Sequence, residues 1–114
     1  MMKKLKCLGF LLLFSLNIQV MASPTGADVL TTCEESLASG FQGITGMMCV
    51  WYVTPCDCHI GKDPAIPRVC LPDGMETETL AREVIEGLKS RPELQSETAE
   101  LASNSVLTIK YPCD

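Results

Sequence analysis

The chain has 114 residues, of which 46% are hydrophobic and 20% are charged, and its formal charge is −5. This length provides one small domain rather than two. The acidic balance argues against a nucleic-acid surface, which needs an excess of Lys and Arg, and the apolar content is too high for a disordered chain. The long apolar run at residues 7–20 is too short to span a bilayer. We therefore expect a compact acidic domain with no nucleic-acid partner.

Residues 1–22 have the pattern of a cleavable signal peptide. Three lysines form a basic n-region, residues 7–20 form an apolar h-region, and small residues precede Ser23. A lipoprotein signal would need its cysteine at the end of the h-region, whereas Cys7 lies at the start. We therefore expect export, cleavage before Ser23, and one mature domain at residues 23–114 that contains no membrane segment.

Removal of the signal peptide changes the charge and the cysteine count. It leaves six basic and fourteen acidic side chains, a formal charge of −8, and six of the seven cysteines. An even count in an oxidising compartment indicates disulfides, although the count alone does not choose the pairs. Each bridge adds roughly 2–4 kcal/mol to the free energy of unfolding, which supplements the core of so small a domain.

The N-terminal half of the mature chain predicts two helices. Residues 28–37 form a short first helix, which Thr25 opens. Residues 37–53 carry glycines at three-residue spacing, which cost helix stability unless another backbone packs closely against this face. The rest of this segment is apolar and favours a buried helix, with a flexible loop as the alternative. The glycines are Gly40, Gly43 and Gly46, and the apolar residues are Met47, Met48, Val50, Trp51 and Val53.

Residues 54–69 break the helical pattern. Prolines and a glycine interrupt the segment, and Cys56, Cys58 and His59 lie among them. A loop this long in a small domain is usually functional or held by disulfides. Residues 70–74 follow as a turn, because Pro and Asp-Gly favour one.

The C-terminal part predicts two amphipathic helices. Thr77 or Thr79 caps the first, and the second begins at the capping-box sequence of residues 90–93 and stops at Pro112. No segment alternates as a strand would, so the predicted fold class is all-α, a small disulfide-stapled domain of about four to five helices. The apolar positions are Leu80, Val84, Ile85 and Leu88 in the first helix, and Leu94, Leu101, Ala102, Val106 and Ile109 in the second.

No residue pattern argues for an enzyme. The single histidine, His59, follows Cys58, but adjacent residues seldom point at each other, and cysteines in an oxidising compartment are mostly bridged. Cys56, Cys58 and His59 could ligate zinc, yet oxidation would compete and a structural site needs two well-separated ligand pairs. The many glutamates fit solvated helix faces. We therefore expect no catalytic residue, no metal and no cofactor.

Short motifs in the mature chain occur in a distinctive order. Cys70-Leu71-Pro72 precedes a helix that ends near Leu88, Arg91-Pro92-Glu93 starts the next helix, and Tyr111-Pro112-Cys113 ends the chain. Upstream, the segment from Phe41 to Gly46 is rich in glycine. In these elements, which cover most of the mature chain, the sequence resembles the Rap/Tai family of type VI secretion immunity proteins.

The resemblance implies a function and one disulfide. Members of this family are periplasmic, all-helical proteins, often homodimers, that bind and block a peptidoglycan amidase effector, a papain-like cysteine peptidase that cuts stem peptides. The resemblance also implies a Cys70–Cys113 bridge, because both cysteines match family positions. The family's other bridge joins a first-helix cysteine, matched here by Cys33, to a position that aligns near Gly40, where this chain has no cysteine.

The other cysteines must therefore pair differently from the family pattern. A direct bridge between Cys56 and Cys58 would be strained, which disfavours the Cys33–Cys49 pair that would accompany it. We expect either Cys33–Cys56 with Cys49–Cys58, or Cys33–Cys58 with Cys49–Cys56.

An immunity protein would block an amidase by occupying its cleft. A loop already ordered by disulfides and prolines binds with less loss of entropy, so we expect residues 54–69 to enter the cleft. The charge of −8 would speed encounter with a basic effector, or serve solubility alone. A periplasmic chaperone or stress module and a lysozyme-type inhibitor remain as alternatives from other classes. The candidate contacts are Trp51, which could equally be core, Tyr52, Asp57, His59, Lys62 and Asp63.

Overall fold

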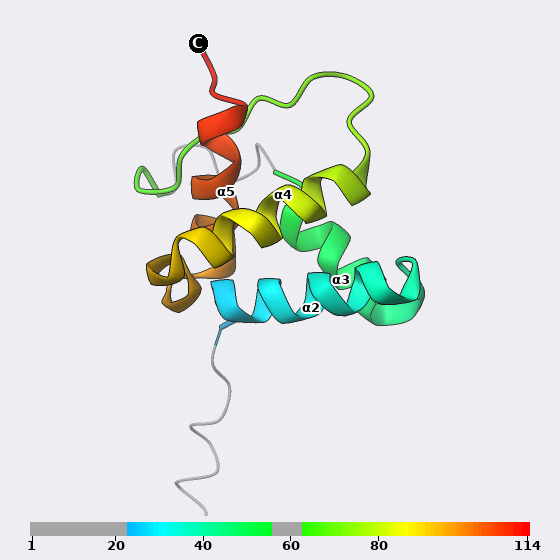
Figure 1. Ribbon diagram of the computed structural model, residues 1–114. Helices are drawn as coiled ribbons and strands as arrows, with labels where there is room; N and C mark the ends of the chain where they lie inside the picture. Colours follow the sequence, from blue (N-terminus) through cyan, green and yellow to red (C-terminus); the bar gives the residue numbers. More distant parts are fainter. Residues whose placement is uncertain (1–22, 56–62) are drawn as a thin grey trace, which may run out of the picture.

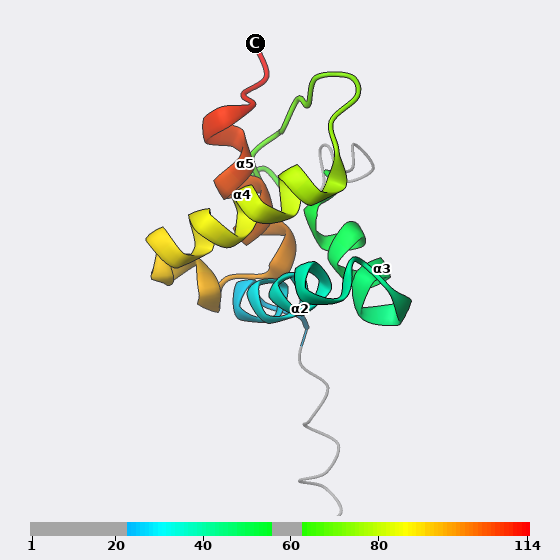
Figure 2. The ribbon, with the colours of Figure 1, turned by 45° about the vertical axis from the view of Figure 1, so that its right-hand side comes forward.

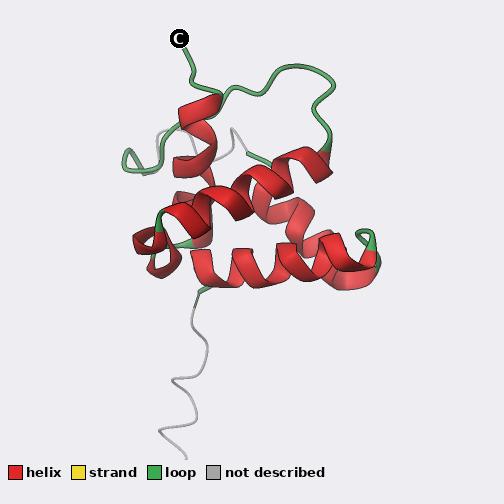
Figure 3. Cartoon of the chain, in the orientation of Figure 1, coloured by secondary structure: helices red, strands yellow, loops and turns green. Residues whose placement is uncertain are grey.

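A computed structural model describes residues 23–55 and 63–114, and these residues form a helical domain (Figures 1 and 3). The all-α prediction is confirmed, because within the described residues the only pairing of extended backbone is an isolated bridge between Thr25 and Thr98. The predicted signal peptide lies outside the described residues. The elements are α2 (Gly26–Ser39), α3 (Gly43–Val53), α4 (Thr77–Ser90), the 3-10 helix η3 (Pro92–Ser96) and α5 (Ala99–Lys110).

Helix α2 begins where the sequence predicts. Thr25 is its N-cap, and the Thr25 backbone N–H donates a hydrogen bond of 2.8 Å to Asp28 Oδ2. This carboxylate also lies in the first turn, where the helix dipole favours negative charge. Two backbone hydrogen bonds, from Gly26 N to Glu97 O and from Ala99 N to Pro24 O, join the start of α2 to the start of α5.

The prediction of one buried helix over residues 37–53 is wrong. Helix α2 ends at Ser39, and Gly40 then takes a left-handed conformation with φ 69°. A left-handed glycine is a common way for a helix to end, because a side chain there would clash with the backbone. Helix α3 begins only at Gly43. The repeated glycines therefore include a helix stop, which their spacing alone does not reveal.

The turn at residues 40–42 folds α3 back along α2 and brings Cys33 to Cys49 (Figure 1). These two cysteines form a disulfide with a Cα–Cα distance of 4.9 Å, and both are fully buried. Both pairings expected from the sequence are therefore wrong, since each assigned Cys33 and Cys49 to other partners. The physical reason is that Cys33 and Cys49 lie at similar distances along the chain on either side of the turn. Cys56 and Cys58 lie outside the described residues.

The amphipathic helix α4 is confirmed, with Leu80, Val84, Ile85 and Leu88 all buried. Its N-cap is Glu76, so neither predicted threonine caps it. Together with residues from α2, α3, η3 and α5, these side chains form one hydrophobic core. Figures 1 and 2 show α4 across the middle of the domain, with α5 toward the left and α3 toward the right, and α3 and α5 also contact each other.

The second C-terminal helix is two elements rather than one. Pro92 begins the short helix η3, and the chain becomes extended at Glu97 before Thr98 caps α5. Thr98 Oγ1 accepts a hydrogen bond from Leu101 N. Glu97 O accepts the hydrogen bond from Gly26 N at the start of α2. The pairing with α2 therefore interrupts the helical pattern, which local spacing does not foresee.

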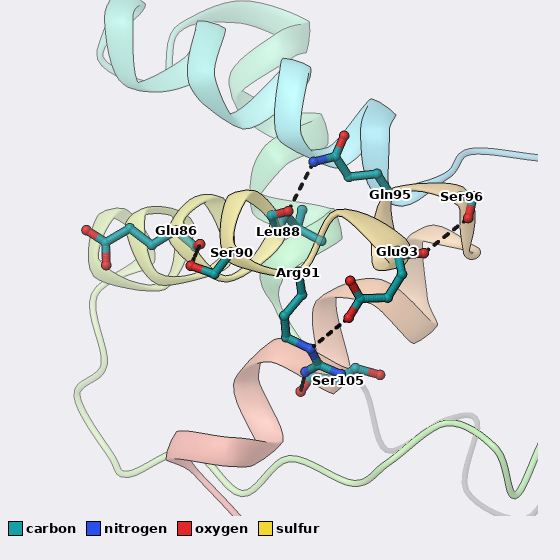
Figure 4. Close-up of polar contacts among 8 residues, drawn as sticks. All are labelled: Glu86, Leu88, Ser90, Arg91, Glu93, Gln95, Ser96 and Ser105. Carbon is teal, nitrogen blue, oxygen red and sulfur yellow. Dashed lines mark hydrogen bonds and ion pairs between the residues drawn. The ribbon is translucent and has the colours of Figure 1, made fainter.

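The corner between α4 and η3 is held by polar contacts (Figure 4). Ser90, predicted to start the next helix, is the last residue of α4, and its hydroxyl donates to Glu86 O. Gln95 Nε2 donates to Leu88 O at 3.0 Å, and Arg91 Nη1 donates to Ser105 O of α5 at 3.3 Å. These bonds fix the direction in which α5 leaves α4.

Candidate functional site

Helix α3 contains no charged side chain, and its two sides have different environments. Gly46, Cys49 and Val53 are buried and face the rest of the domain. A Cβ at Gly46 would overlap the backbone of Phe41, so a glycine is needed where the preceding turn crosses the helix. This side of the helix explains why α3 is attached to the domain.

The opposite side of α3 is apolar and exposed. Ile44 is 77% exposed, Met47 is 73% exposed and Trp51 is 82% exposed, and Met48 is also exposed. Their spacing of three, four and seven residues places them on one side of a helix. We call Ile44, Met47, Met48 and Trp51 the α3 apolar face. This arrangement contradicts the expectation of a buried helix.

The α3 apolar face is held in a fixed position. The Cys33–Cys49 disulfide joins the buried side of α3 to α2. In addition, the buried Ser36 hydroxyl lies 2.8 Å from Thr32 O and 2.9 Å from Thr45 O, so it bridges α2 to the first turn of α3. A binding surface on a rigid element loses little conformational entropy when a partner docks.

The structure brings only part of the predicted contact set together. Trp51 belongs to the α3 apolar face, whereas Tyr52 points to the side of the helix that packs against the core. Asp63 is exposed within the long loop, where Asp63 Oδ1 accepts a hydrogen bond of 2.9 Å from Ala65 N. Asp57, His59 and Lys62 lie outside the described residues.

The last residues of the long loop are fastened to α5. Asn104 Nδ2 donates to Pro67 O at 3.1 Å, and Thr108 Oγ1 donates to Arg68 O at 2.8 Å. Next along the chain, Cys70 forms a disulfide with Cys113, the pair that the family resemblance implies. The segment that leads out of the loop is therefore positioned by α5 and by the C-terminus.

An ionic cluster lies at the end of α5. Glu83 Oε1 accepts hydrogen bonds from Lys110 Nζ at 2.7 Å and from Tyr111 Oη at 2.8 Å. The hydrogen bond and charge of Glu83 raise the pKa of Lys110. Burial, and then the hydrogen bond to Glu83, raises the pKa of Tyr111. This network ties the end of α5 to α4.

Sequence reasoning missed three of the four residues of the α3 apolar face, namely Ile44, Met47 and Met48. Their helical spacing was visible, but an apolar stripe is more often core than surface. The signal that could have found them is the second apolar stripe: Gly46, Cys49 and Val53 already supply a buried side. Both sides of α3 are apolar, and the core of a domain this small can cover only one of them.

The exposed apolar side of α3 is a candidate surface for another protein. Within the described residues, no three His, Cys, Asp or Glu side chains are placed to hold a metal ion. No helix in residues 23–55 and 63–114 is long and apolar enough to cross a membrane. Fold and site therefore define a small, disulfide-bonded helical domain with an exposed apolar helix for binding.

A comparison with protein families identifies the class further. The family model of the Rap1a immunity proteins matches residues 25–113, which is most of the chain. The chain belongs to the Rap1a immunity protein family. Proteins of this kind bind a partner effector protein and are generally not enzymes. None of the curated proteins or solved structures compared with the chain matches it.

Proposed function

We propose that this protein protects the cell that makes it by binding and inhibiting a type VI secretion effector, a peptidoglycan amidase, in the periplasm. Membership of the Rap1a immunity family supports the immunity role. The signal-peptide pattern of residues 1–22 supports export to the compartment that contains peptidoglycan. Two disulfides within the described residues are in keeping with an oxidising compartment.

The observation that carries this proposal is the α3 apolar face. Protein interfaces are depleted of charge at their centre and enriched in aromatic residues and Met, and Trp is a frequent hot-spot residue. The α3 apolar face has this composition, and it lies on a rigid helix in a chain whose mature charge is −8. In our proposal the effector covers this face, with Trp51 at the centre of the contact.

The long loop, residues 54–69, takes the inhibitory role in the same proposal. Its first residues continue directly from α3, and its last residues are held on α5 by Asn104 and Thr108. Docking through α3 would therefore present the loop to the same effector. In this arrangement the helix supplies affinity and the loop excludes substrate from the amidase cleft.

The first test is stoichiometric inhibition. Oxidised residues 23–114 are mixed with purified papain-like amidase effectors encoded beside immunity genes, and stem-peptide cleavage is measured on purified peptidoglycan. We expect activity to disappear at one subunit per effector, together with a stable complex. A folded, oxidised protein that leaves each effector active would contradict the proposal for those effectors.

The second test addresses the surface. Because Trp51 is largely exposed, Trp51→Ala should leave the thermal unfolding of the free protein nearly unchanged. It should weaken effector binding by about 2 kcal/mol or more, roughly thirtyfold, as expected for a hot-spot residue. Ser96→Ala is the control, because its helix η3 makes no contact with α3. Equal affinities of Trp51→Ala and the parent protein would place the effector on another surface.

An exposed apolar helix would also suit a chaperone, which is the second candidate function. A chaperone would bind many unfolded proteins through this face, so it would suppress the aggregation of reduced or heated model substrates. Such suppression without amidase inhibition would favour the chaperone. Inhibition of lysozyme in a parallel peptidoglycan assay would instead favour the lysozyme-type inhibitor.

A further inference from the structure

The reduced sulfur atoms of the domain are concentrated on α3. Residues 23–114 contain the methionines Met47, Met48 and Met75, and the first two belong to the α3 apolar face. Every cysteine in residues 23–55 and 63–114 is part of a disulfide. In this part of the chain, therefore, the sulfur atoms that remain reduced are methionine thioethers.

The three thioethers differ in their access to solvent. Met47 is 73% exposed and Met48 is 43% exposed, whereas Met75 is partly buried and packs against the hydrophobic core. The susceptibility of a sulfur atom to a dissolved oxidant follows its exposure. The two methionines of α3 should therefore react first, and Met75 should react more slowly.

Met47 and Met48 lie away from the packed side of α3. That side is formed by Gly46, Cys49 and Val53, and the disulfide from Cys49 to α2 holds it in place. In the free protein, a polar group added on the opposite side of the helix would be hydrated rather than buried in the core. Oxidation at these two positions should therefore leave α3 in place and change the chemical character of its exposed side.

The modification is a two-electron oxidation of the thioether. The sulfur atom attacks one oxygen of hydrogen peroxide, an S–O bond forms and the O–O bond breaks, and the peroxide is reduced to water. The sulfur atom loses two electrons, and methionine becomes methionine sulfoxide, which is polar. A sulfoxide reductase reverses the change: two thiols become a disulfide, the sulfoxide oxygen leaves as water, and the thioether is restored.

We propose that Met47 and Met48 form an oxidation site, at which a peroxide reversibly converts the α3 apolar face into a polar one and thereby lowers affinity for the partner. The effect on affinity rests on the proposed function, in which the effector covers this face. The centre of a protein interface is apolar and excludes water, so a sulfoxide oxygen there would lose its hydration without gaining a hydrogen bond. Oxidation should therefore weaken the complex while the free protein stays folded.

Trp51 supplies an internal reporter of the modification. It is the single tryptophan of the chain, and it follows Met47 by four residues and Met48 by three. These spacings place side chains next to one another on a helix surface. The indole of Trp51 is 82% exposed, so its fluorescence responds to the groups beside it. The emission of Trp51 should therefore change at the rate at which the two sulfoxides form.

The first experiment treats the free, disulfide-bonded protein, residues 23–114, with hydrogen peroxide. Tandem mass spectrometry of its peptides gives the rate of sulfoxide formation at each methionine, and circular dichroism follows the helices. We expect Met47 and Met48 to react at least about threefold faster than Met75. The modified protein should keep its helices and elute earlier from a hydrophobic-interaction column. Equal rates at all three methionines, or loss of helix in step with oxidation of Met47 and Met48, would overturn the oxidation site.

The second experiment measures affinity for a papain-like amidase effector that the untreated protein inhibits, before and after peroxide. Met47→Leu/Met48→Leu removes both thioethers and keeps the side chains apolar and similar in volume, and Met75→Leu is the matched control. Peroxide should weaken binding by the parent protein and by Met75→Leu about tenfold or more, because a polar group is buried without a partner. The affinity of Met47→Leu/Met48→Leu should be the same before and after treatment. Prereduced methionine sulfoxide reductase, freed of excess thiol, should restore the parent protein.

The outcomes separate this proposal from the proposed function. An effector that binds the parent protein equally well before and after oxidation of both α3 methionines would overturn the effect on affinity. A protein that binds no effector before oxidation would sink the proposed function, and the effect on affinity with it. The order of oxidation and the column retention need no effector, so they decide the oxidation site in either case.

Discussion

Glu83 accepts hydrogen bonds from two side chains through one oxygen. Lys110 Nζ lies 2.7 Å from Glu83 Oε1, and Tyr111 Oη lies 2.8 Å from the same atom. The hydrogen bond to Glu83 and the Glu83 charge favour the protonated form of each group, and they help to raise each pKa above its ordinary value, 10.5 for Lys110 and 10.0 for Tyr111. For Tyr111 the largest cause is burial of the phenol.

The sign of the pH dependence follows from these shifts. A pKa that is raised in the folded state gives stability that is present below the unfolded value and lost as the pH rises through the folded value. The cluster should therefore stabilise the protein fully below pH 10.0 and lose this contribution in more alkaline solution. Near neutral pH the contribution of this cluster to stability should be present in full and should not change with pH.

Glu83→Gln tests the role of the carboxylate. It should lower the pKa of Tyr111 toward the ordinary value without reaching it, because the phenol remains partly buried. Tyrosinate absorbance after a rapid pH jump measures this pKa, and a Tyr52→Phe background leaves Tyr111 as the only tyrosine. An unchanged pKa in Glu83→Gln would show that burial alone causes the shift.

At the scale of elements, the sequence predicted helices well and their exposure poorly. Helix α4 was predictable because Leu80, Val84, Ile85 and Leu88 face one way while polar residues cover the other side. Helix α3 was not, because its buried and exposed sides are both apolar and periodicity cannot tell them apart. The break at Glu97 was also hidden, since it depends on hydrogen bonding to α2 in a distant part of the chain.

The contact between α4 and α5 at Gly87 predicts that Gly87→Ala lowers the free energy of unfolding, whereas Gly→Ala inside a helix usually raises it. Gly→Ala inside a helix usually stabilises by about 1 kcal/mol, but overpacking a tight contact costs roughly 1–3 kcal/mol. A Cβ at Gly87 would overlap the Val106 side chain, so the second effect should win and Gly87→Ala should destabilise the protein.

Shortening the Val106 side chain should reverse the effect of Gly87→Ala on stability. In a Val106→Ala background, Gly87→Ala has room for its Cβ and should stabilise by about 1 kcal/mol relative to Val106→Ala alone. Urea unfolding of the four proteins of this cycle gives both numbers. Additive effects of the two substitutions would mean that Gly87 and Val106 do not constrain each other.

At the scale of the whole molecule, the two described disulfides hold different layers. Cys33–Cys49 lies in the core and fixes α3 on α2, whereas Cys70–Cys113 lies nearer the surface and ties the end of the long loop to the C-terminus. The family resemblance implied the outer bridge, because both of its cysteines match family positions. It could not foresee the inner one, because that pairing depends on the turn at residues 40–42.

The difference in burial predicts the order in which these two bridges are reduced. Both Cys33 and Cys49 are fully buried, while Cys70 is exposed, and thiol–disulfide exchange needs access to a sulfur atom. Mild reductant should therefore open Cys70–Cys113 first. The product should keep its helices and the α3 apolar face, because the inner bridge still joins α2 to α3.

Loop length alone would suggest that the outer bridge matters more. Chain-entropy estimates give about 4 kcal/mol for the outer bridge and about 3 kcal/mol for the inner one, whose cysteines are 43 and 16 residues apart. Removing the inner bridge also takes two sulfur atoms out of the core, which adds roughly 1–2 kcal/mol. We therefore expect Cys33→Ala/Cys49→Ala to cost at least as much stability as Cys70→Ala/Cys113→Ala.

Timed alkylation with peptide mapping gives the order of reduction, and circular dichroism follows the helices. Loss of helix in step with opening of Cys70–Cys113 would mean that the outer bridge, rather than the inner one, holds the domain together.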